Sequence, residues 1–176
     1  MVASVLLLMV IAALPSAHPQ MPSGREVVSP SAYASFNPVA RGSSLQLAVV
    51  LKIRNGFHIN ARQTSADYLI ATDLRADAPA GFKPGDVSYP QGELRTFAFS
   101  KKPLNVYEDK VILRIPVSVL SDAPLGAQHL PLKLRYQACS NEVCLPPVTL
   151  DVDATVTVAG NADASRPAHP ELFPAQ

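Results

Sequence analysis

The stretch from Val148 to Val158 reads VTLDVDATVTV, and it indicates the fold class more clearly than any other part of the chain. Its apolar side chains alternate strictly with threonine and aspartate, which is the period of a β-strand that buries one face. A helix would bring its apolar positions back every three or four residues instead. The stretch therefore predicts a long strand with one face in a hydrophobic core and the other in water.

Other segments upstream show the same alternation: Leu45–Ile53, Val111–Val117 and Leu130–Tyr136. Shorter strand candidates are Phe57–Ala61, Tyr68–Leu74, Val87–Tyr89 and Arg95–Phe99. Asn55-Gly56 marks a turn, and Pro116 favours an edge strand or a strand end, because proline cannot donate to a ladder. Alternating strands at short spacing, with no amphipathic helix between them, predict an all-β fold: an antiparallel sandwich or barrel.

The composition agrees with this fold class and excludes several kinds of protein. The chain has 176 residues, which fits one domain. Its 17 prolines are about twice the usual share of roughly 5%, which argues against long helices. A formal net charge of +1 offers no basic face for nucleic acid. The sequence has no G-x-S-x-G motif, phosphate-binding glycine loop or clustered metal-ligand motif, so we expect no metal and no bound cofactor.

The two ends of the chain read differently from the strands. Val2–Leu14 is apolar and uncharged; it is too short for a membrane span of roughly 20 residues but fits a signal peptide. No Lys or Arg precedes it, and a short membrane anchor or a buried strand is the alternative. We expect a signal peptide over residues 1–17, a flexible lead-in over 18–29, one β domain over 30–159 and a disordered tail over 160–176. Export to the periplasm, or secretion, would place the domain where disulfides can form.

The two cysteines lie in the segment YQACSNEVCLPP, between the predicted strands Leu130–Tyr136 and Val148–Val158. Ser140-Asn141-Glu142 is turn-like, so Cys139 and Cys144 are expected to close a hairpin loop. A bond between them would contribute only roughly 2 kcal/mol by loop closure, and a small exposed ring is prone to exchange. Pro146, followed by Pro147, stiffens the exit from the loop. A structural disulfide is the simplest interpretation; a metal site or a cysteine nucleophile has less support, because no motif places the histidines.

The cysteine segment, extended to YQACSNEVCLPPVT, resembles the active-site segment of the N-terminal periplasmic domain of the DsbD thiol:disulfide interchange protein family. Three further segments resemble that family in the same order: KIRNGFHIN from Lys52, VSYPQG from Val87 and FAFSKKPLNVYEDK from Phe97. The resemblance covers nearly the whole expected β domain. It implies an immunoglobulin-like antiparallel β-sandwich that exchanges thiols and disulfides through the cysteine pair.

The resemblance also implies roles for single residues. By motif position, Cys144 would form the mixed disulfide with partners, and Cys139 would resolve it. In this family a loop places an aromatic ring over the sulfurs, and Phe99 is the first candidate for that ring here. Phe97 is the second candidate, with an ordinary core position as its alternative.

Further neighbours of the pair follow from the same comparison. His58 and Asn60 fall where the family has polar or aromatic residues near the cysteines, so they would hydrogen-bond a thiolate or tune its pKa. The alternative is that both face solvent after the Asn55-Gly56 turn. Tyr136 either packs beside the cysteine pair or fills the core at the end of its strand.

These residues lead to two hypotheses. The first is an exported redox relay, a protein-disulfide reductase component that passes electrons between a thioredoxin-like donor and exported thiol proteins. Full-length DsbD-type proteins continue into a membrane domain and a thioredoxin-like domain, and this sequence contains neither. We therefore expect either a stand-alone domain or a truncated product, with the donor, such as a membrane reductase, on a separate protein. The second hypothesis is a non-enzymatic immunoglobulin-like binding module with a structural disulfide.

Overall fold

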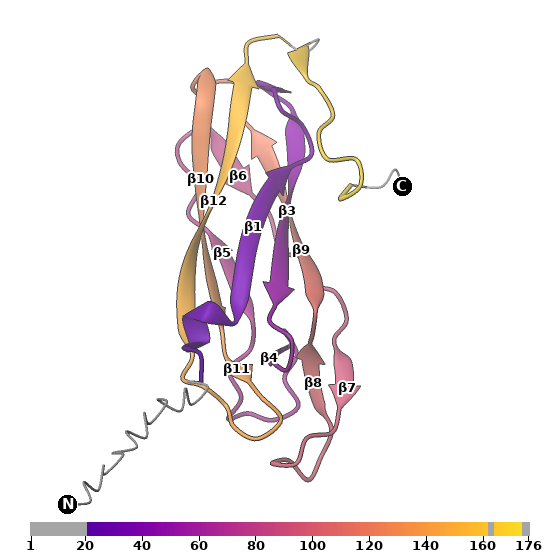
Figure 1. Cartoon of the computed structure of the whole chain (residues 1–176). Coiled ribbons are helices and arrows are strands. Elements are labelled where there is room, and N and C mark those ends of the chain that lie inside the picture. The colour runs from indigo at the N-terminus through magenta and orange to yellow at the C-terminus, as the bar shows by residue number, and fades with distance from the viewer. Residues whose placement is uncertain (1–20, 162–163, 174–176) are drawn as a thin grey trace, which may run out of the picture.

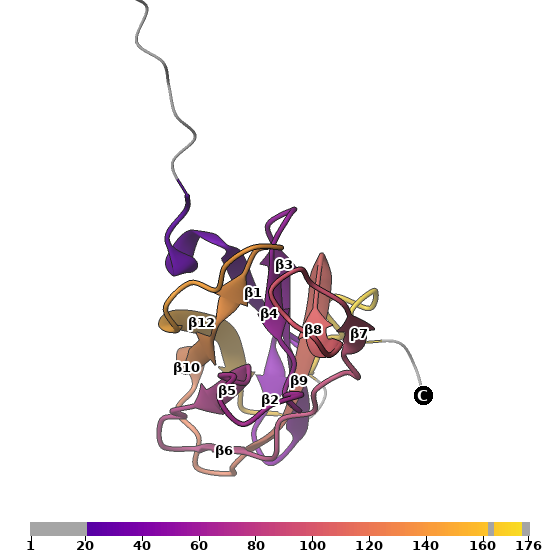
Figure 2. The ribbon, with the colours of Figure 1, turned by 90° about the horizontal axis from the view of Figure 1, so that it is seen from below.

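The computed structural model describes residues 21–161 and 164–173, and the expected signal peptide lies outside these residues. Two four-stranded sheets pack face to face, and a third, smaller sheet lies at one end of them (Figure 1). Viewed from that end, β4, β8 and β7 of the small sheet overlie the sandwich (Figure 2). In the described part of the chain no α-helix occurs, and no helix is long and apolar enough to cross a membrane. The prediction of an all-β immunoglobulin-like sandwich is confirmed.

The first sheet has the order β1-β3-β9-β6, with every neighbouring pair antiparallel. Its strands are β1 (Val28–Ala34), β3 (Ser44–Ile53), β9 (Lys110–Val119) and β6 (Phe82–Pro84). Along β9, residues on one face are buried and those on the other are at least partly exposed, as its alternating sequence predicts.

The second sheet has the order β2-β12-β10-β5. Its strands are β2 (Val39–Ala40), β12 (Val148–Ala159), β10 (Gly126–Tyr136) and β5 (Asp73–Ala76). β10 and β12 form an antiparallel ladder from Gly126 opposite Val158 to Tyr136 opposite Val148, whereas β2 joins β12 in parallel. The apolar residues of this ladder meet those of the first sheet in one continuous core, which also contains Leu47, Leu113 and Ile115.

The third sheet has the order β11-β4-β8-β7 and consists of short antiparallel strands. They are β11 (Ala138–Cys139), β4 (His58–Asn60), β8 (Leu104–Tyr107) and β7 (Glu93–Arg95). β11 follows β10 after one residue, so the second sheet leads directly into the strand that carries Cys139. The third sheet is therefore where the cysteine pair meets the rest of the fold.

Pro116 and Pro131 lie inside strands that have neighbouring strands on both sides. Pro116 belongs to β9, which has neighbours on both sides, so the expectation of an edge strand or a strand end is wrong. The N–H of Gly85 donates to the Pro116 carbonyl at 2.8 Å, just after β6 ends. Because a residue's nitrogen and carbonyl point to the same side of a strand, the missing N–H faces the place where the neighbouring strand stops. Pro131 in β10 is equivalent, since its carbonyl accepts the N–H of Asp77 at 2.9 Å just after β5.

The segment before the first strand is more ordered than the sequence suggests. Gly24–Glu26 forms a short 3-10 helix, η1, and Val27 and Val28 are buried in the core. A Cβ at position 24 would meet Val148 and the carbonyl of Pro146 at 3.0 and 3.1 Å, so glycine allows this close approach without a shift of its neighbours. Tertiary contacts therefore order residues 24–29, which differ there from the flexible lead-in expected over 18–29.

Part of the expected tail is also ordered against the outer face of the first sheet. The Arg166 and Ala168 N–H groups donate to the carbonyls of Pro38 and Ser35, and the Arg114 side chain donates to the Leu172 carbonyl at 3.0 Å. The ring of His169 meets that of Tyr33 at 4.8 Å. Residues 164–173 thus run alongside the first sheet (Figure 1), and they differ there from the disordered segment expected over 160–176.

Candidate functional site

The cysteine pair closes a tight hairpin at the end of the third sheet. Cys139 and Cys144 form a disulfide with their Cα atoms 3.9 Å apart, and they face each other as an antiparallel bridge. On either side, the Ser140 N–H donates to the Val143 carbonyl and the Leu145 N–H to the Ala138 carbonyl, both at 2.8 Å. The hairpin expected from Ser140-Asn141-Glu142 is therefore present.

The two sulfur-bearing residues differ in exposure. Cys139 is fully buried, at 0% relative exposure, whereas Cys144 on the return side of the loop is partly exposed. Pro146 and the residue after it are exposed as well, and Val143 is 40% exposed. The disulfide is therefore accessible to solvent at Cys144 rather than at Cys139.

His58 lies directly opposite Cys139 in the ladder between β4 and β11. Its side chain is 1% exposed, and its Nε2 atom has no hydrogen-bond partner among the described residues. Burial lowers the pKa of His58 from its ordinary 6.5 to about 4, because a charged imidazolium is costly away from water. The ring is therefore neutral at physiological pH.

Phe97 and Phe99 stack near His58 with almost parallel rings. The His58 and Phe97 ring centroids are 3.8 Å apart, and the Phe99 centroid lies 5.5 Å from that of Phe97 and 6.3 Å from that of His58. Phe97 is 7% exposed in a small apolar cluster with Leu69, Leu104 and Val106, whereas Phe99 is 40% exposed. Phe97 is thus a core residue of this cluster that stacks on His58, whereas Phe99 is the more exposed of the two rings.

Asn60 is buried at the other end of β4 and connects three segments. Its Nδ2 donates to the Ile70 carbonyl at 3.0 Å and to Gln137 Oε1 at 3.4 Å, while its carbonyl accepts the hydroxyl of Thr72. Its Oδ1 is buried without a partner in the described residues. The alternative that His58 and Asn60 face solvent is wrong, because both residues are buried within the third sheet.

Gln137 is a residue of the site that sequence reasoning missed. Its Oε1 accepts the Ile70 N–H, and its Nε2 donates to the carbonyl of Leu145, each at 3.3 Å. Gln137 therefore connects Leu145, the residue after Cys144, to Ile70, whose carbonyl accepts a hydrogen bond from Asn60. Its place inside the YQAC motif was the available signal, but a glutamine between two strands reads as an ordinary surface residue.

Tyr136 belongs to the core rather than to the surroundings of the sulfurs. Its ring is fully buried in the sandwich, and its hydroxyl donates to the Gly24 carbonyl at 2.7 Å. Burial raises the pKa of this phenol to about 12. Of the two interpretations of Tyr136, the structure supports core packing, with the added task of fastening η1 to β10.

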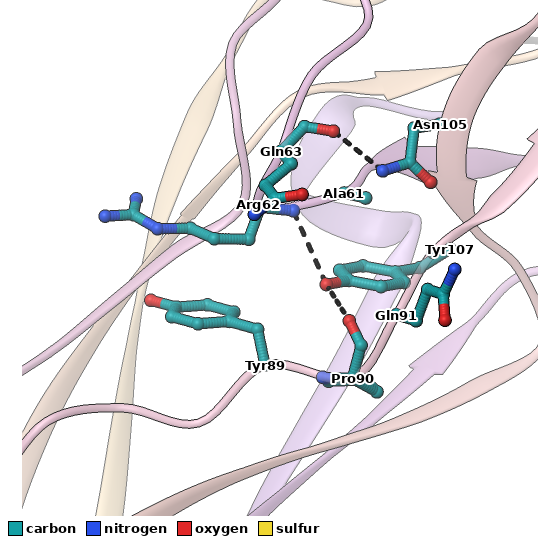
Figure 3. A pocket seen from close by; sticks show the side chains of 9 residues that line it. Ala61, Arg62, Gln63, Tyr89, Pro90, Gln91, Asn105 and Tyr107 are labelled. Atoms are coloured by element: carbon teal, nitrogen blue, oxygen red, sulfur yellow. Dashed lines mark hydrogen bonds between the residues drawn. The ribbon is translucent and has the colours of Figure 1, made fainter.

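Two of the cavities that adjoin the third sheet are lined by β4 or by the residues next to it. One, of about 270 Å³, is lined by His58, Glu108, Asp109 and Asn141 with the turn before β4, and so lies next to the cysteine loop. The other, of about 400 Å³, is lined by the segment after β4 and by Tyr89–Gly92 (Figure 3).

The walls of the larger cavity are formed in part by the segment VSYPQG, which several interactions hold in place. The Tyr107 hydroxyl donates to the Pro90 carbonyl at 2.8 Å (Figure 3). Arg62 lies over the Tyr89 ring at 5.2 Å and pairs with Asp73 at 2.8 Å. A side chain at Gly92 would meet the Cβ of Ala61 at 2.7 Å. These contacts explain the segment by packing, and none of the predicted site residues lines this cavity.

The fold and the site together define a class: a β-sandwich that presents a half-exposed disulfide at one end, beside a buried and neutral histidine. Residues 25–155 match the family described as thiol:disulfide interchange protein DsbD, N-terminal. The chain belongs to this family. Its expected resemblance to that family is thus confirmed over nearly the whole β domain.

Solved structures similar to this chain are distant relatives in sequence. The N-terminal periplasmic domain of ScsB from Proteus mirabilis is 16% identical, with 78% of this chain and 48% of that chain covered and a TM-score of 0.48. This chain thus spans about half the length of that one. A non-cellulosomal cohesin from the archaeon Archaeoglobus fulgidus is 14% identical, with 77% and 94% covered and a TM-score of 0.38. A PapD-like domain of human CEP192 is 12% identical, with 88% and 99% covered and a TM-score of 0.36. Among curated proteins, none matches the chain in sequence.

Proposed function

We propose that this protein is an exported thiol–disulfide interchange domain that relays electron pairs through Cys139 and Cys144. The observation that carries the proposal is the asymmetry of the disulfide, with Cys139 fully buried and Cys144 partly exposed in a chain of this family. An exchange relay needs one sulfur that partners can reach and a second that only the first can reach, because the mixed disulfide must be resolved from within.

In the first half-reaction, a thiolate of a thioredoxin-like donor attacks Sγ of Cys144. The bond between the two cysteines breaks, Cys139 leaves as a thiolate and takes up a proton, and donor and Cys144 are joined in a mixed disulfide. A second donor thiolate attacks the donor sulfur of that bond, and Cys144 is released and protonated. The donor is then oxidised by two electrons, and the domain holds two thiols.

In the second half-reaction, the Cys144 thiolate attacks a disulfide of an exported substrate protein. One substrate sulfur leaves as a thiolate, and the other is bonded to Cys144. The Cys139 thiolate then attacks Sγ of Cys144, which releases the second substrate thiolate and restores the disulfide. The disulfide itself carries the electrons, so the relay uses no bound cofactor, and the domain acts as a protein-disulfide reductase component in the periplasm.

The shielding of the site agrees with this use. Phe97 and Phe99 cover the side of the third sheet next to His58, so small thiols reach the buried sulfur only through Cys144. Exposed Pro146, after the loop, leaves the approach to Cys144 open. Partners would accordingly be proteins whose reactive cysteine projects from their surface.

The proposal is tested by two single-cysteine variants that are matched to each other. With oxidised glutathione as the probe, Cys139→Ser is expected to form a stable mixed disulfide through Cys144. Cys144→Ser should react at least about tenfold more slowly, because its remaining sulfur is buried. Equal rates for the two variants would contradict the assigned roles.

The reduction potential of the wild-type pair decides between relay and structural bond. In a dithiothreitol or glutathione redox buffer, we expect a potential within the range of exchangeable protein disulfides. A potential below about −300 mV, typical of inert structural bonds, would overturn the proposal and favour a binding module whose disulfide only stabilises the loop.

A further inference from the structure

The proposed relay requires a charge at a buried place. When a partner attacks Cys144, the leaving group is the sulfur of Cys139, whose side chain is 0% exposed. A thiolate out of contact with water is strongly disfavoured unless a hydrogen-bond donor faces it. A poorer leaving group also slows the exchange itself. The relay therefore needs a polar group beside Cys139 that does not come from solvent.

The β4–β11 ladder brings one such group to the sulfur. His58 and Cys139 are direct partners across the antiparallel pair, so their side chains lie on the same face of the third sheet. Cβ atoms of directly opposite residues are roughly 4.5–5.5 Å apart. The imidazole is held in place by the Phe97 ring, which stacks on it at 3.8 Å with an angle of 17° between the planes.

The imidazole also has an unused hydrogen-bonding atom. His58 Nε2 is buried and lacks a partner in the described part of the chain, while the other buried side chains of this region are hydrogen-bonded at least in part. An unpaired buried polar atom forfeits its hydration without compensation. Such an atom costs stability in the oxidised state, and that cost is offset only in a state of the site that supplies a partner.

We propose that His58 is the buried hydrogen-bond donor for the Cys139 thiolate in the reduced and mixed-disulfide states. In its Nε2–H tautomer the neutral ring donates a hydrogen bond to the sulfur, and it keeps its own proton. The thiolate forms as the disulfide bond breaks and is later protonated by water. The inference rests on the proposed function, and it adds a positioning residue to the cysteine pair.

The surroundings of His58 favour a neutral donor over an imidazolium. Burial is the cause of its lowered pKa. Glu108 and Asp109 line the same cavity, and the pKa of His58 is lowered in their presence. Glu108 is already paired with Arg95 at 3.0 Å. The thiolate is therefore stabilised by a hydrogen bond from an uncharged ring.

The first experiment measures the pKa of the Cys139 thiol by thiolate absorbance in a Cys144→Ala background. Replacement of His58→Phe keeps an aromatic ring to stack on Phe97 but removes the donor. It should raise the pKa of Cys139 by about one to two, the range of a hydrogen bond to a charged group. His58→Gln retains an N–H at a similar reach and should restore most of the difference.

Ile59→Val is the matched control. It lies on the same strand and is fully buried, but it belongs to the main core and so faces away from Cys139. It should lower stability and leave the pKa of the Cys139 thiol unchanged. An equal change in the pKa for Ile59→Val and His58→Phe would show a general loss of packing and would overturn the inference.

The second experiment measures reduction of the intact disulfide by dithiothreitol. In the His58→Phe protein the rate should fall about threefold to tenfold, because the leaving thiolate has become more basic. An unchanged rate with an unchanged pKa of Cys139 overturns the role of His58. A wild-type disulfide that dithiothreitol does not reduce would instead overturn the proposed function, so the two failures are distinguishable.

A measurement on unaltered His58 covers the case in which its variants do not fold. In the Cys144→Ala protein, the ¹⁵N resonance of His58 Nε2 should shift as Cys139 titrates, with the same midpoint as the thiolate absorbance. A resonance that stays constant through that titration would show that Nε2 does not face the sulfur, and the inference would fall.

Discussion

The β10–β12 ladder and the third sheet use opposite means to hold their shape. β10 and β12 are long strands paired along their whole length, with apolar side chains on the inner face. In the third sheet β11 has two residues and β8 has four, so backbone ladders contribute little. Buried polar side chains in the described residues occur only in and beside this sheet, at His58, Asn60 and Thr72.

Because of this difference, the sandwich accounts for most of the stability, and the third sheet positions the polar side chains near the disulfide. The sandwich gains its stability from apolar burial, which has no directional requirement. The third sheet is held by side-chain hydrogen bonds through Asn60, Thr72 and Gln137, and these bonds require a defined distance and angle. Among the described residues, both buried side-chain atoms that lack a partner, His58 Nε2 and Asn60 Oδ1, lie in this region. Among the described residues, the third sheet and the segments beside it are therefore where buried polar atoms are left without hydrogen bonds.

The largest expected effect is on the free energy of unfolding, and it concerns the apolar core of the sandwich. Leu134 in β10 is 0% exposed, and Leu134→Ala should lower the free energy of unfolding by about 2–5 kcal/mol. Urea denaturation measures this loss. The rate at which dithiothreitol reduces the folded variant should stay within about twofold of wild type, and a larger change would show that the two regions are coupled.

The second effect tests the buried histidine through pH. The pKa of His58 is about 4 in the folded state and near 6.5 when unfolded, so the unfolded chain binds a proton first as the pH falls. Stability from this group is complete above pH 6.5 and is lost as the pH drops towards 4, by about 3 kcal/mol in total. Denaturation of wild type and His58→Phe between pH 7 and 4 should show a smaller loss in the variant.

That comparison also controls for other acidic groups. Glu108 and Asp109 line the cavity next to His58 and are present in both proteins, so only the difference between the two pH profiles reports on the histidine. Parallel profiles would show that His58 is not the group responsible.

The third effect concerns the disulfide. Replacement of both Cys139 and Cys144 by serine should cost only roughly 2 kcal/mol, since the bond closes a loop with a sequence separation of 5. Thermal or urea denaturation of the double variant, compared with the oxidised wild type, measures this. A loss at the upper end of the range given for Leu134→Ala would indicate a structural disulfide and would weaken the separation between the two regions.

The smallest effect concerns the junction between the regions. Tyr136→Phe removes the hydroxyl that donates to the Gly24 carbonyl and leaves that buried acceptor unpaired, which should cost about 1–2 kcal/mol. Hydrogen exchange should show increased opening of η1 and the start of β1. An unchanged reaction of Cys144 with glutathione is expected, because Tyr136 points into the sandwich core.

How well the sequence predicts each strand depends on the strand's length. Leu45–Ile53 and Leu130–Tyr136 correspond closely to β3 and β10, because a long alternating run has a visible period. The short strands are displaced: Arg95–Phe99 was expected where β7 covers Glu93–Arg95, and Val87–Tyr89 contributes only the bridge between Ser88 and Arg114. A strand of two to four residues has no period of its own, so its partner decides where it begins and ends.

The candidate site divides in the same way. The sequence alone determined the cysteine pair and its hairpin loop, because these depend on spacing within one short segment. It also determined the family, because four segments resemble that family in the same order. Only the tertiary structure decided that His58 lies buried opposite Cys139, that Phe97 stacks on it, and that Gln137 joins the loop to Ile70. Those relations connect segments far apart in the chain, and burial is a property of what packs around a residue, which no local pattern encodes.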